Sequence, residues 1–461
     1  MTENSASAAN QTETADPSSA PVMIRNPSGQ NFPDRRRYRS ELPKPPQTVE
    51  ETGLDFLFLV DLLCKVLFLK GQMRTSDLLA HTRLSLGVLK PLLDFMRTER
   101  MCEMTSHSIA EATSIYNLSE TGRQRAEDAL RRSRYAGPAP VTLAVYNETV
   151  RQQSVLGMRV GKEDITNAFE GVMIRQELLD QFGAAMNSGR AIFVHGPAGS
   201  GKTFIAEHLA NVLSGNILAP YAILVDSDII EVFDPLIHKP IRPDAALTPT
   251  STLDNSGRFD ARWELCQRPV VLAGGELTLS MLDLEFDDKT RFYHAPPQVK
   301  ANNGLLIIDD LGRQIVPAQQ LMNRWIVPLD RRMDHLALHT GVKFVIPFDV
   351  IVVFSSNMSP SNLADEAFLR RLGYKIHIGE LSEHEYTTVF RSACESLGIS
   401  YTESGLRFIL DTHRQHGKPL LACSPRDLLG QVSDYARYQD RTPELSEDML
   451  TWAWNNYYAV D

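Results

Sequence analysis

One stretch decides the fold of this chain: His195-Gly196-Pro197-Ala198-Gly199-Ser200-Gly201-Lys202-Thr203. It matches G-x-x-x-x-G-K-[ST], a pattern whose glycines let the backbone curl until successive N–H groups point at a phosphate. An apolar run at 191–194 predicts a buried strand before it, and an apolar face over 204–213 predicts a helix after it. Lys202 would then offer a mobile positive charge to the β- and γ-phosphates, and the Thr203 hydroxyl would be a Mg²⁺ ligand. The sequence therefore predicts a nucleoside triphosphate site; a glycine-rich turn that binds nothing is the disfavoured alternative.

Composition narrows the class of protein. The chain has 461 residues, enough for two or three domains, and a formal net charge of −10, so no global basic field attracts nucleic acid or anionic lipid. Its five cysteines are scattered without C-x-x-C spacing, which disfavours a disulfide framework or a zinc site. The most apolar run, at 54–69, contains three charged residues and is too short to span a bilayer. With no apolar secretory signal at the N-terminus, we expect a cytoplasmic protein without membrane insertion.

The N-terminal part divides into a tail, a small domain and a linker. Residues 1–47 are rich in small polar residues and proline, which predicts a disordered tail with a basic cluster at 35–39. Residues 48–135 contain three helical segments, two extended pieces at 101–104 and 114–118, and a last helix beginning near Ser119. Residues 116–122 resemble the wing-to-helix segment of bacterial winged-helix domains. The third helical segment, at 85–96, is mostly apolar, so we favour docking of a protein over reading of DNA.

After a linker at 136–160, alternating strands and helices predict an α/β nucleotide-binding core at 161–379. Apolar runs at 221–226, 305–310, 350–354 and 374–378 would join the strand at 191–194 in a parallel five-stranded sheet with helices on both faces. A helix over 276–284 and an exposed polar insertion over 238–262 are expected between them. Four helical segments, at 383–397, 403–416, 425–438 and 447–458, predict a helical lid over 380–461.

Polar residues follow two of the predicted strands. Asp309 and Asp310 end the strand that begins at 305, at the edge where open α/β sheets place their ligands. Asp309 would hold Mg²⁺ opposite Thr203, and Asp310 would polarise the attacking water. Asn357 ends the neighbouring strand and could orient the same water. Solvated aspartates and an ordinary turn asparagine are the structural alternatives.

Three arginines are further candidates. Arg370 and Arg371 end a predicted helix at 363–372, where a cation suits the helix dipole. They could instead reach the γ-phosphate in a neighbouring subunit, as an arginine finger does. Arg426 follows Ser424 and Pro425, which read as an N-cap and a first helical residue. A cation at that end opposes the dipole, so Arg426 should face an anion such as a nucleotide phosphate.

Together these residues resemble the AAA+ ATPases, from about residue 161 to the C-terminus. By that resemblance, residues 196–203 are the Walker A motif, residues 305–310 the Walker B motif, Asn357 sensor 1, Arg370 or Arg371 the finger, and Arg426 sensor 2. Segments 301–310, 325–332 and 345–348 are similar to the MoxR-like branch, which acts on proteins. Asp310 departs from the family, because most members have the longer glutamate there. Residues 306–312 also resemble helicase loaders of the IstB and DnaC type.

The resemblance implies ATP and Mg²⁺ as cofactors and a homo-oligomeric ring, such as a hexamer. The whole chain resembles bacterial AAA-family ATPases described loosely as having chaperone activity. The leading hypothesis is thus an ATPase that remodels a protein partner recruited by the winged-helix-like domain. The alternatives are a DNA-associated motor or loader, and a switch that binds ATP and hydrolyses it slowly.

Overall fold

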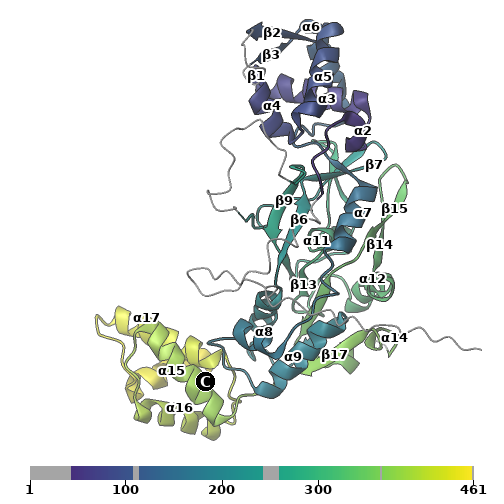
Figure 1. The fold of residues 1–461 in the computed structure, drawn as a ribbon. Helices are drawn as coiled ribbons and strands as arrows, with labels where there is room; N and C mark the ends of the chain where they lie inside the picture. The colour runs from purple at the N-terminus through teal and green to yellow at the C-terminus, as the bar shows by residue number, and fades with distance from the viewer. Residues whose placement is uncertain (1–42, 107–113, 242–258, 364–365, 459–461) are drawn as a thin grey trace, which may run out of the picture. The chain divides into compact units, whose positions relative to one another are not determined.

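A computed structural model describes residues 43–106, 114–241, 259–363 and 366–458 (Figure 1). Its central element is a parallel sheet whose strands lie in the order β10 (Val270–Ala273), β13 (Leu305–Ile308), β16 (Ile351–Ser356), β5 (Ala191–His195) and β17 (Leu372–His377). All four pairings are parallel. Every residue of β13 and β16 is buried, as expected for strands covered on both faces. The predicted α/β fold with a five-stranded parallel sheet is confirmed.

Helices cover both faces of this sheet. On one face, α8 (Lys162–Ala168), α9 (Gln176–Ser188) and α10 (Lys202–His208) contribute to a buried apolar cluster with alternate residues of β5, β13 and β16. On the other, α12 (Ala318–Arg331) packs against the remaining strand residues, with Trp325 2% exposed. Because successive strand residues point to opposite faces, the two clusters share the strands without sharing residues.

One predicted strand of this sheet was wrong. Residues 221–226 do contain a strand, β7 (Ala222–Val225), but it lies in a second sheet, and β10 takes its place in the parallel sheet. Asp226 has a φ of 55°, a left-handed turn conformation that returns the chain directly into β8 (Asp228–Glu231) as an antiparallel partner. A tight antiparallel turn cannot make the crossover that a parallel pair needs. The helix predicted over 276–284 is reduced to a 3₁₀ turn, η4 (Ser280–Leu282).

The second sheet connects distant segments. Its strand order is β11 (Glu285–Asp287), β12 (Phe292–His294), β8, β7 and β4 (Val141–Thr142). Two further strand pairs are β6 (Asn216–Pro220) with β9 (Trp263–Gln267) and β14 (Met333–Ala337) with β15 (Lys343–Pro347). The segment expected as a linker, 136–160, contains β4 and the helix α7 (Leu143–Gln152). This segment is therefore part of the packed structure.

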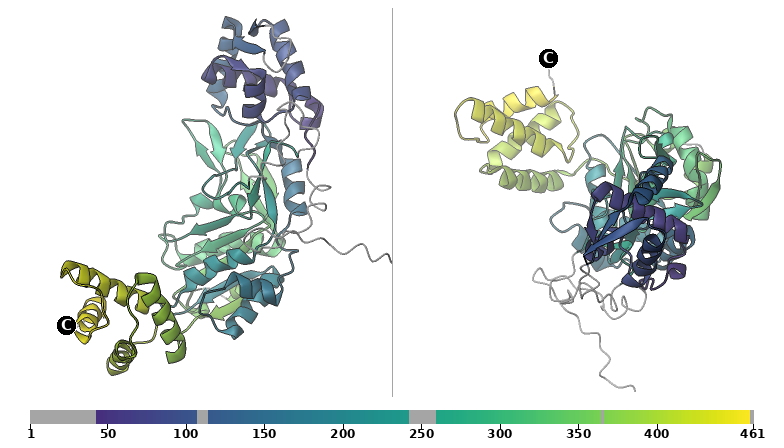
Figure 2. Two further views of the ribbon diagram at one scale, coloured as in Figure 1. Left: turned by 60° about the vertical axis from the view of Figure 1, so that its left-hand side comes forward. Right: turned by 90° about the horizontal axis from the view of Figure 1, so that it is seen from above.

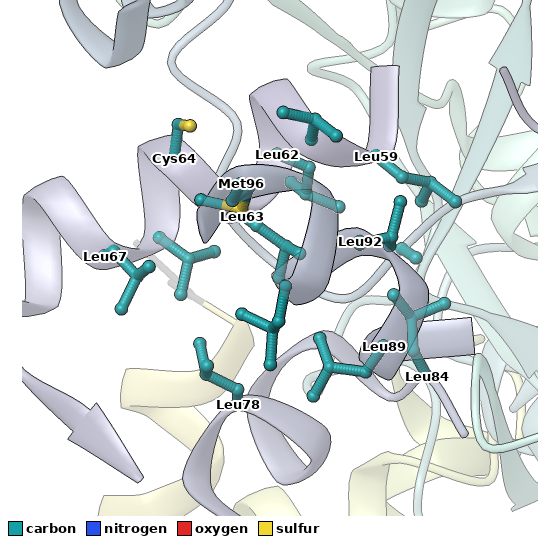
Figure 3. Packing of buried hydrophobic residues seen from close by; sticks show 14 of the residues in the cluster. Leu59, Leu62, Leu63, Cys64, Leu67, Leu78, Leu84, Leu89, Leu92 and Met96 are labelled. Carbon is teal, nitrogen blue, oxygen red and sulfur yellow. The ribbon is translucent and has the colours of Figure 1, made fainter. Parts of the chain in front are cut away.

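In the described residues up to Arg132, five helices and a small sheet form what we call the N-terminal domain. The helices are α2 (Val49–Thr52), α3 (Phe56–Lys70), α4 (Thr75–Thr82), α5 (Leu86–Thr98) and α6 (Glu120–Arg132). The antiparallel sheet has the order β1 (Met73–Arg74), β3 (Ile115–Leu118), β2 (Cys102–Ser106). Leucines of α3, α4 and α5 fill the core between them (Figure 3). Pro91 lies inside α5, which continues past it.

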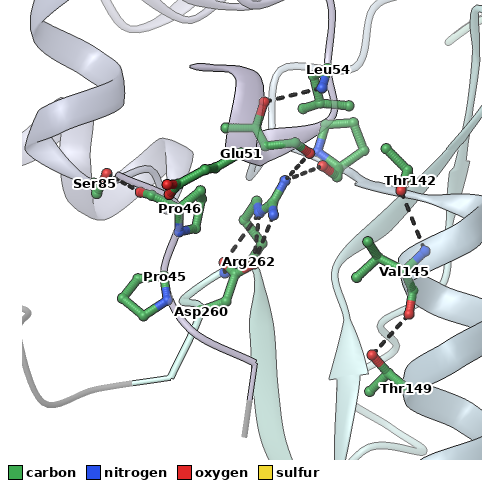
Figure 4. Close-up of polar contacts among 12 residues, drawn as sticks. Pro45, Pro46, Glu51, Leu54, Ser85, Thr142, Val145, Thr149, Asp260 and Arg262 are labelled. Carbon is green, nitrogen blue, oxygen red and sulfur yellow. Dashed lines mark hydrogen bonds and ion pairs between the residues drawn. The ribbon is translucent and has the colours of Figure 1, made fainter. Parts of the chain in front are cut away.

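The core of the N-terminal domain is completed by the second sheet. Ala222 and Ile229 belong to the same buried cluster as the leucines, at 0% and 2% exposed. A buried ion pair adds a polar connection, because Arg262 binds Asp260 and donates to the carbonyls of Thr52 and Pro140 (Figure 4). Of the predicted exposed insertion, residues 242–258 lie outside the described residues, and its end at 260–262 includes this buried pair.

Residues 383–458 fold as α15 (Glu383–Leu397), α16 (Glu403–Gln415), α17 (Ser424–Tyr438) and α18 (Glu447–Tyr458). They match the four helices expected from the sequence and form a bundle, which we call the helical domain (Figure 2). Its apolar core includes Phe390 and Trp454. In the described part of the chain, no helix has the length and apolar character needed to cross a membrane.

Candidate nucleotide-binding site

The loop between β5 and α10 has the backbone that its glycines predict. Gly196, Gly199 and Gly201 have φ values of 154°, 82° and 90°, conformations that other residues rarely adopt. A Cβ atom added to Gly196 would clash with the carbonyl oxygen of Ile378, and one added to Gly199 with the sulfur of Cys423. Pro197, Ala198 and Ser200 complete the loop, and all three line the cavity described below.

Lys202 stands at the first position of α10, with 6% of its surface exposed. Its Nζ atom donates to the carbonyl oxygens of Gly196 at 3.1 Å and Pro197 at 2.8 Å, and to Oδ1 of Asn357 at 2.7 Å. Burial lowers the pKa of Lys202, while the nearby carboxylates of Asp309 and Asp310 act in the opposite direction. The amine is therefore held by neutral oxygens at the mouth of the loop, where a phosphate could replace them.

The two predicted carboxylates take different partners. Thr203 Oγ1 donates to Asp309 Oδ2 at 2.8 Å, and Asp309 Oδ1 accepts from the backbone N–H of Asp310 at 2.9 Å. Asp310 has a φ of 48°, and its Oδ1 accepts from Nδ2 of Asn357 at 3.1 Å. Asn357 thus bridges Lys202 and Asp310 from the end of the adjacent strand. The structure brings together all five polar residues predicted for this part of the site.

The hydroxyl of Thr203 and the carboxylate of Asp309 fit Mg²⁺, which prefers oxygen ligands. Among the described residues, no group of three or more His, Cys, Asp and Glu side chains could hold a metal ion. Two protein oxygens suit Mg²⁺ because it keeps several waters and binds substrate phosphates. The Oγ atom of Ser200 is buried in the loop without a hydrogen-bond partner, so a polar atom is left for a ligand.

A cavity of about 1870 Å³ opens over the loop. Its walls come from the loop and α10, from residues 171–178, from β17 and from α15 and α17. Arg426 lines it and is exposed, and among the described residues it has no ion-pair or hydrogen-bond partner. The expectation that Arg426 faces an anion is compatible with this position and stays a prediction. The predicted cap differs, because Cys423 rather than Ser424 is the N-cap of α17.

Arg370 and Arg371 do not line this cavity. The helix predicted at 363–372 is short, since α14 (Glu366–Leu369) ends before both arginines and β17 begins at Leu372. Arg370 pairs with Glu366 at 2.8 Å, and Arg371 pairs with Asp330 at 2.7 Å. The structure thus places both arginines in ion pairs outside this cavity, and the finger role stays a prediction.

Sequence reasoning missed an ion pair in the cavity wall. Arg175 donates to both carboxylate oxygens of Glu385, at 2.7 and 2.9 Å, and to the carbonyl oxygen of Glu380 at 2.9 Å. Ser382 donates to the same carboxylate through its N–H and its hydroxyl. These donors, chiefly Arg175, lower the pKa of Glu385 to about 2. The capping box Ser382-x-x-Glu385 was readable from the sequence, but its partner lies 210 positions away.

Two histidines under the loop were also missed. His195 ends β5 and pairs in register with His377 of β17, with ring centroids 5.0 Å apart. Burial, together with the nearby His377 and Lys202, lowers the pKa of His195. The loop also contacts the helical domain, because the N–H of Cys423 donates to the carbonyl oxygen of Gly199 at 3.1 Å.

Comparisons with known proteins add little to this geometry. Residues 382–456 match a family described as Domain of unknown function (DUF8689). No curated protein sequence matches the chain. Among solved structures, the chain is similar to NtrX from Brucella abortus in complex with ADP, at 12% identity and a TM-score of 0.36, covering 71% of this chain and 57% of that one. It is also similar to a RuvB mutant from Thermotoga maritima, at 12% identity and a TM-score of 0.35, covering 67% and 74%. At these scores the assignment of the site rests on its own geometry.

Proposed function

We propose that this chain is an ATPase of the AAA+ type that binds ATP with Mg²⁺ and hydrolyses it. One observation carries the proposal: a chain of hydrogen bonds joins Lys202, Asn357, Asp310, Asp309 and Thr203 at the carboxyl ends of three adjacent parallel strands. Sheets of this kind bind their ligands at that edge. A glycine loop, a cation, two carboxylates and an amide are the groups that phosphoryl transfer to water requires.

Each group has a distinct part in this proposal. The N–H groups of the loop and Lys202 bind the phosphates, and Lys202 exchanges its carbonyl partners for phosphate oxygens. Thr203 and Asp309 would hold Mg²⁺, which when bound neutralises charge on the phosphates. Asp310 accepts a proton from the attacking water, and Asn357 fixes the orientation of that carboxylate. Arg426 would meet the phosphates from the helical domain, so that nucleotide binding draws α17 toward the loop.

The cellular role that we favour is remodelling of a protein partner by a homo-oligomeric ring. The net charge of −10 and the apolar α5 support a protein rather than DNA as the partner of the winged-helix-like domain. The slow switch remains a second candidate because of one observation. The carboxylate of Asp310 is one methylene shorter than glutamate and is held by Asn357, which limits its reach toward a water molecule.

Steady-state phosphate release from ATP and Mg²⁺ tests the proposed function. The wild-type chain should hydrolyse ATP, and Lys202→Ala should abolish nucleotide binding because the phosphates lose their main side-chain cation. Arg407→Ala, which removes an exposed cation of α16, is the matched control and should keep full activity. ATP binding without turnover in the wild type would favour the switch, and absence of nucleotide binding would reject the proposal.

A further inference from the structure

An aromatic surface lies on the helical domain, away from the nucleotide cavity. The rings of Tyr435 on α17 and Trp452 on α18 stack with centroids 4.3 Å apart and planes 11° apart. Trp452 is 38% exposed, and Tyr438, one turn along from Tyr435, is 82% exposed. The neighbouring Trp454, by contrast, is 2% exposed in the core. We call Tyr435, Tyr438 and Trp452 the aromatic surface.

Four carboxylates without partners lie near these rings in the sequence. Two of them, Asp434 and Asp448, precede Tyr438 and Trp452 by four positions and so share a helix face with them. The exposed acids are Asp434 and Asp440, close to the tyrosines on α17, and Glu447 and Asp448 at the start of α18. None of the four has an ion pair or hydrogen bond of its side chain with the described residues. Residues 380–461 contain seven Lys and Arg against thirteen Asp and Glu, a formal net charge of −6. The net charge of this region as a whole thus disfavours nucleic acid and anionic lipid and favours cations, although Arg437 and Arg441 are exposed near the tyrosines.

Elsewhere in the same domain, two tyrosine rings are covered by cations. The guanidinium of Arg391 lies over the ring of Tyr401, 4.6 Å from its centroid, and the hydroxyl of Tyr401 donates to Glu403 at 2.8 Å. Lys418 lies over the ring of Tyr458 at 5.3 Å. Within the described residues, no cation lies over the rings of Tyr435, Tyr438 or Trp452. The aromatic surface therefore has the rings and the carboxylates of this arrangement without its cation.

We propose that the aromatic surface binds an arginine-containing segment of a partner protein. A guanidinium stacks on the tyrosine and tryptophan faces, which attract cations through the ring quadrupole, and donates to a flanking carboxylate. Tyrosine, tryptophan and arginine are also the residues that most often dominate the energy of protein interfaces. Arginine fits better than lysine because its planar group stacks and forms paired hydrogen bonds at once.

The surface is separate from the site proposed above but shares a helix with it. Tyr438 lies twelve positions after Arg426, about 18 Å along α17. A partner on the aromatic surface would leave the cavity open, and a movement of α17 caused by a nucleotide would reach the partner. Binding can be measured without nucleotide, so failure of this inference and failure of the proposed ATPase are distinguishable.

The test uses the full chain and its own fluorescence. Of its four tryptophans, Trp263, Trp325 and Trp454 are at most 2% exposed, so quenching by acrylamide reports on Trp452. The probes are capped octapeptides of arginine, of lysine and of glutamate, and a short DNA duplex. We expect the arginine peptide to protect Trp452 from acrylamide and to bind severalfold more tightly than the lysine peptide. The glutamate peptide and the duplex should give no protection.

Variants separate stacking from simple charge attraction. Tyr438→Ala should weaken binding of the arginine peptide about tenfold, the loss expected for an interface residue that dominates binding. Tyr401→Ala is the matched control, because that ring is already covered by Arg391, and it should bind like the wild type. Circular dichroism establishes that both variants fold. Equal affinity for arginine and lysine peptides, or equal effects of the two variants, would overturn the proposal, as would binding of the duplex in this region.

Discussion

Thr203 donates a hydrogen bond of 2.8 Å to Asp309, a residue 106 positions further along the chain. The bond joins the first turn of α10 to the end of β13, so the hydroxyl and the carboxylate are already placed for one cation. It also means that the two oxygens depend on each other for position. Substitution of Thr203 or Asp309 should therefore weaken nucleotide binding more in the presence of Mg²⁺ than in its absence.

Thr203→Val keeps the shape of the side chain and removes only the hydroxyl. We expect ATP binding in the presence of Mg²⁺ to weaken about tenfold, a loss of about 1.4 kcal/mol, and binding without Mg²⁺ to change little. Calorimetric titration with and without Mg²⁺ gives both values. Thr166→Val, which removes an exposed hydroxyl of α8 bonded to its own helix, is the control. Equal losses in the two conditions would mean that Thr203 is not a metal ligand.

Asp310→Asn tests whether Asp310 accepts the proton of the attacking water. The amide keeps the size of the carboxylate and removes its charge, so ATP should still bind while turnover falls by roughly 10²- to 10⁴-fold, the usual contribution of a general base. Phosphate release under saturating ATP measures the rate, and a fluorescent ATP analogue measures binding. An Asp310→Asn protein at full rate would remove Asp310 from catalysis.

Substitution of Arg371 tests whether the active unit is an oligomer. If it completes the site of a neighbouring subunit, Arg371→Ala should bind ATP and lose most turnover, since such arginines contribute roughly 10³–10⁵ in rate. Arg371→Ala and Lys202→Ala subunits, each inactive alone, should recover partial activity when mixed. Loss of the Asp330 pair within the chain is the competing explanation, so Asp330→Asn is the control and should stay active. No recovery in mixed oligomers, confirmed by native mass spectrometry, would mean that Arg371 has a structural role within its own chain.

The Arg175–Glu385 pair predicts how acid loosens the helical domain. The pKa of Glu385 is lowered to about 2 from an ordinary value of 4.5. Its ionised form therefore stabilises the fold above about pH 4.5, and that contribution is lost as the pH falls from about 4.5 toward about 2. Hydrogen exchange in α15 should rise over this range in the wild type. In Glu385→Gln it should be high at every pH, whereas Glu383→Gln, at an exposed pair, should behave like the wild type.

The buried pair of Arg262 and Asp260 predicts a large loss of stability. Both side chains are 3% exposed, so Arg262→Ala leaves a carboxylate buried without its partner. We expect the free energy of unfolding to fall by about 3–5 kcal/mol. Arg414→Ala breaks exposed pairs with Glu383 and Asp411 and should cost less than about 1 kcal/mol. Urea unfolding compares the two, and similar losses would show that burial of the pair contributes little.

The sequence by itself determined the parts that depend on local pattern. The phosphate loop could be predicted because its glycines, lysine and threonine act together within one short turn. Their spacing in the sequence is therefore fixed. The helices α15 and α18 have the predicted bounds, since apolar periodicity and caps such as Ser382 act within a few residues. The positions of Asp309, Asp310 and Asn357 at strand ends were predicted for the same reason.

Only the tertiary structure decided which segments meet. The apolar runs at β7 and β10 look alike in sequence, and the turn at Asp226 together with pairing to β8 assigned them to different sheets. The pairing of Arg175 with Glu385 likewise depends on how the helical domain packs against the core. Hydrophobic burial has no direction, so an apolar run fixes that a strand is buried but not beside which partner. That choice is made by the whole set of packed surfaces at once.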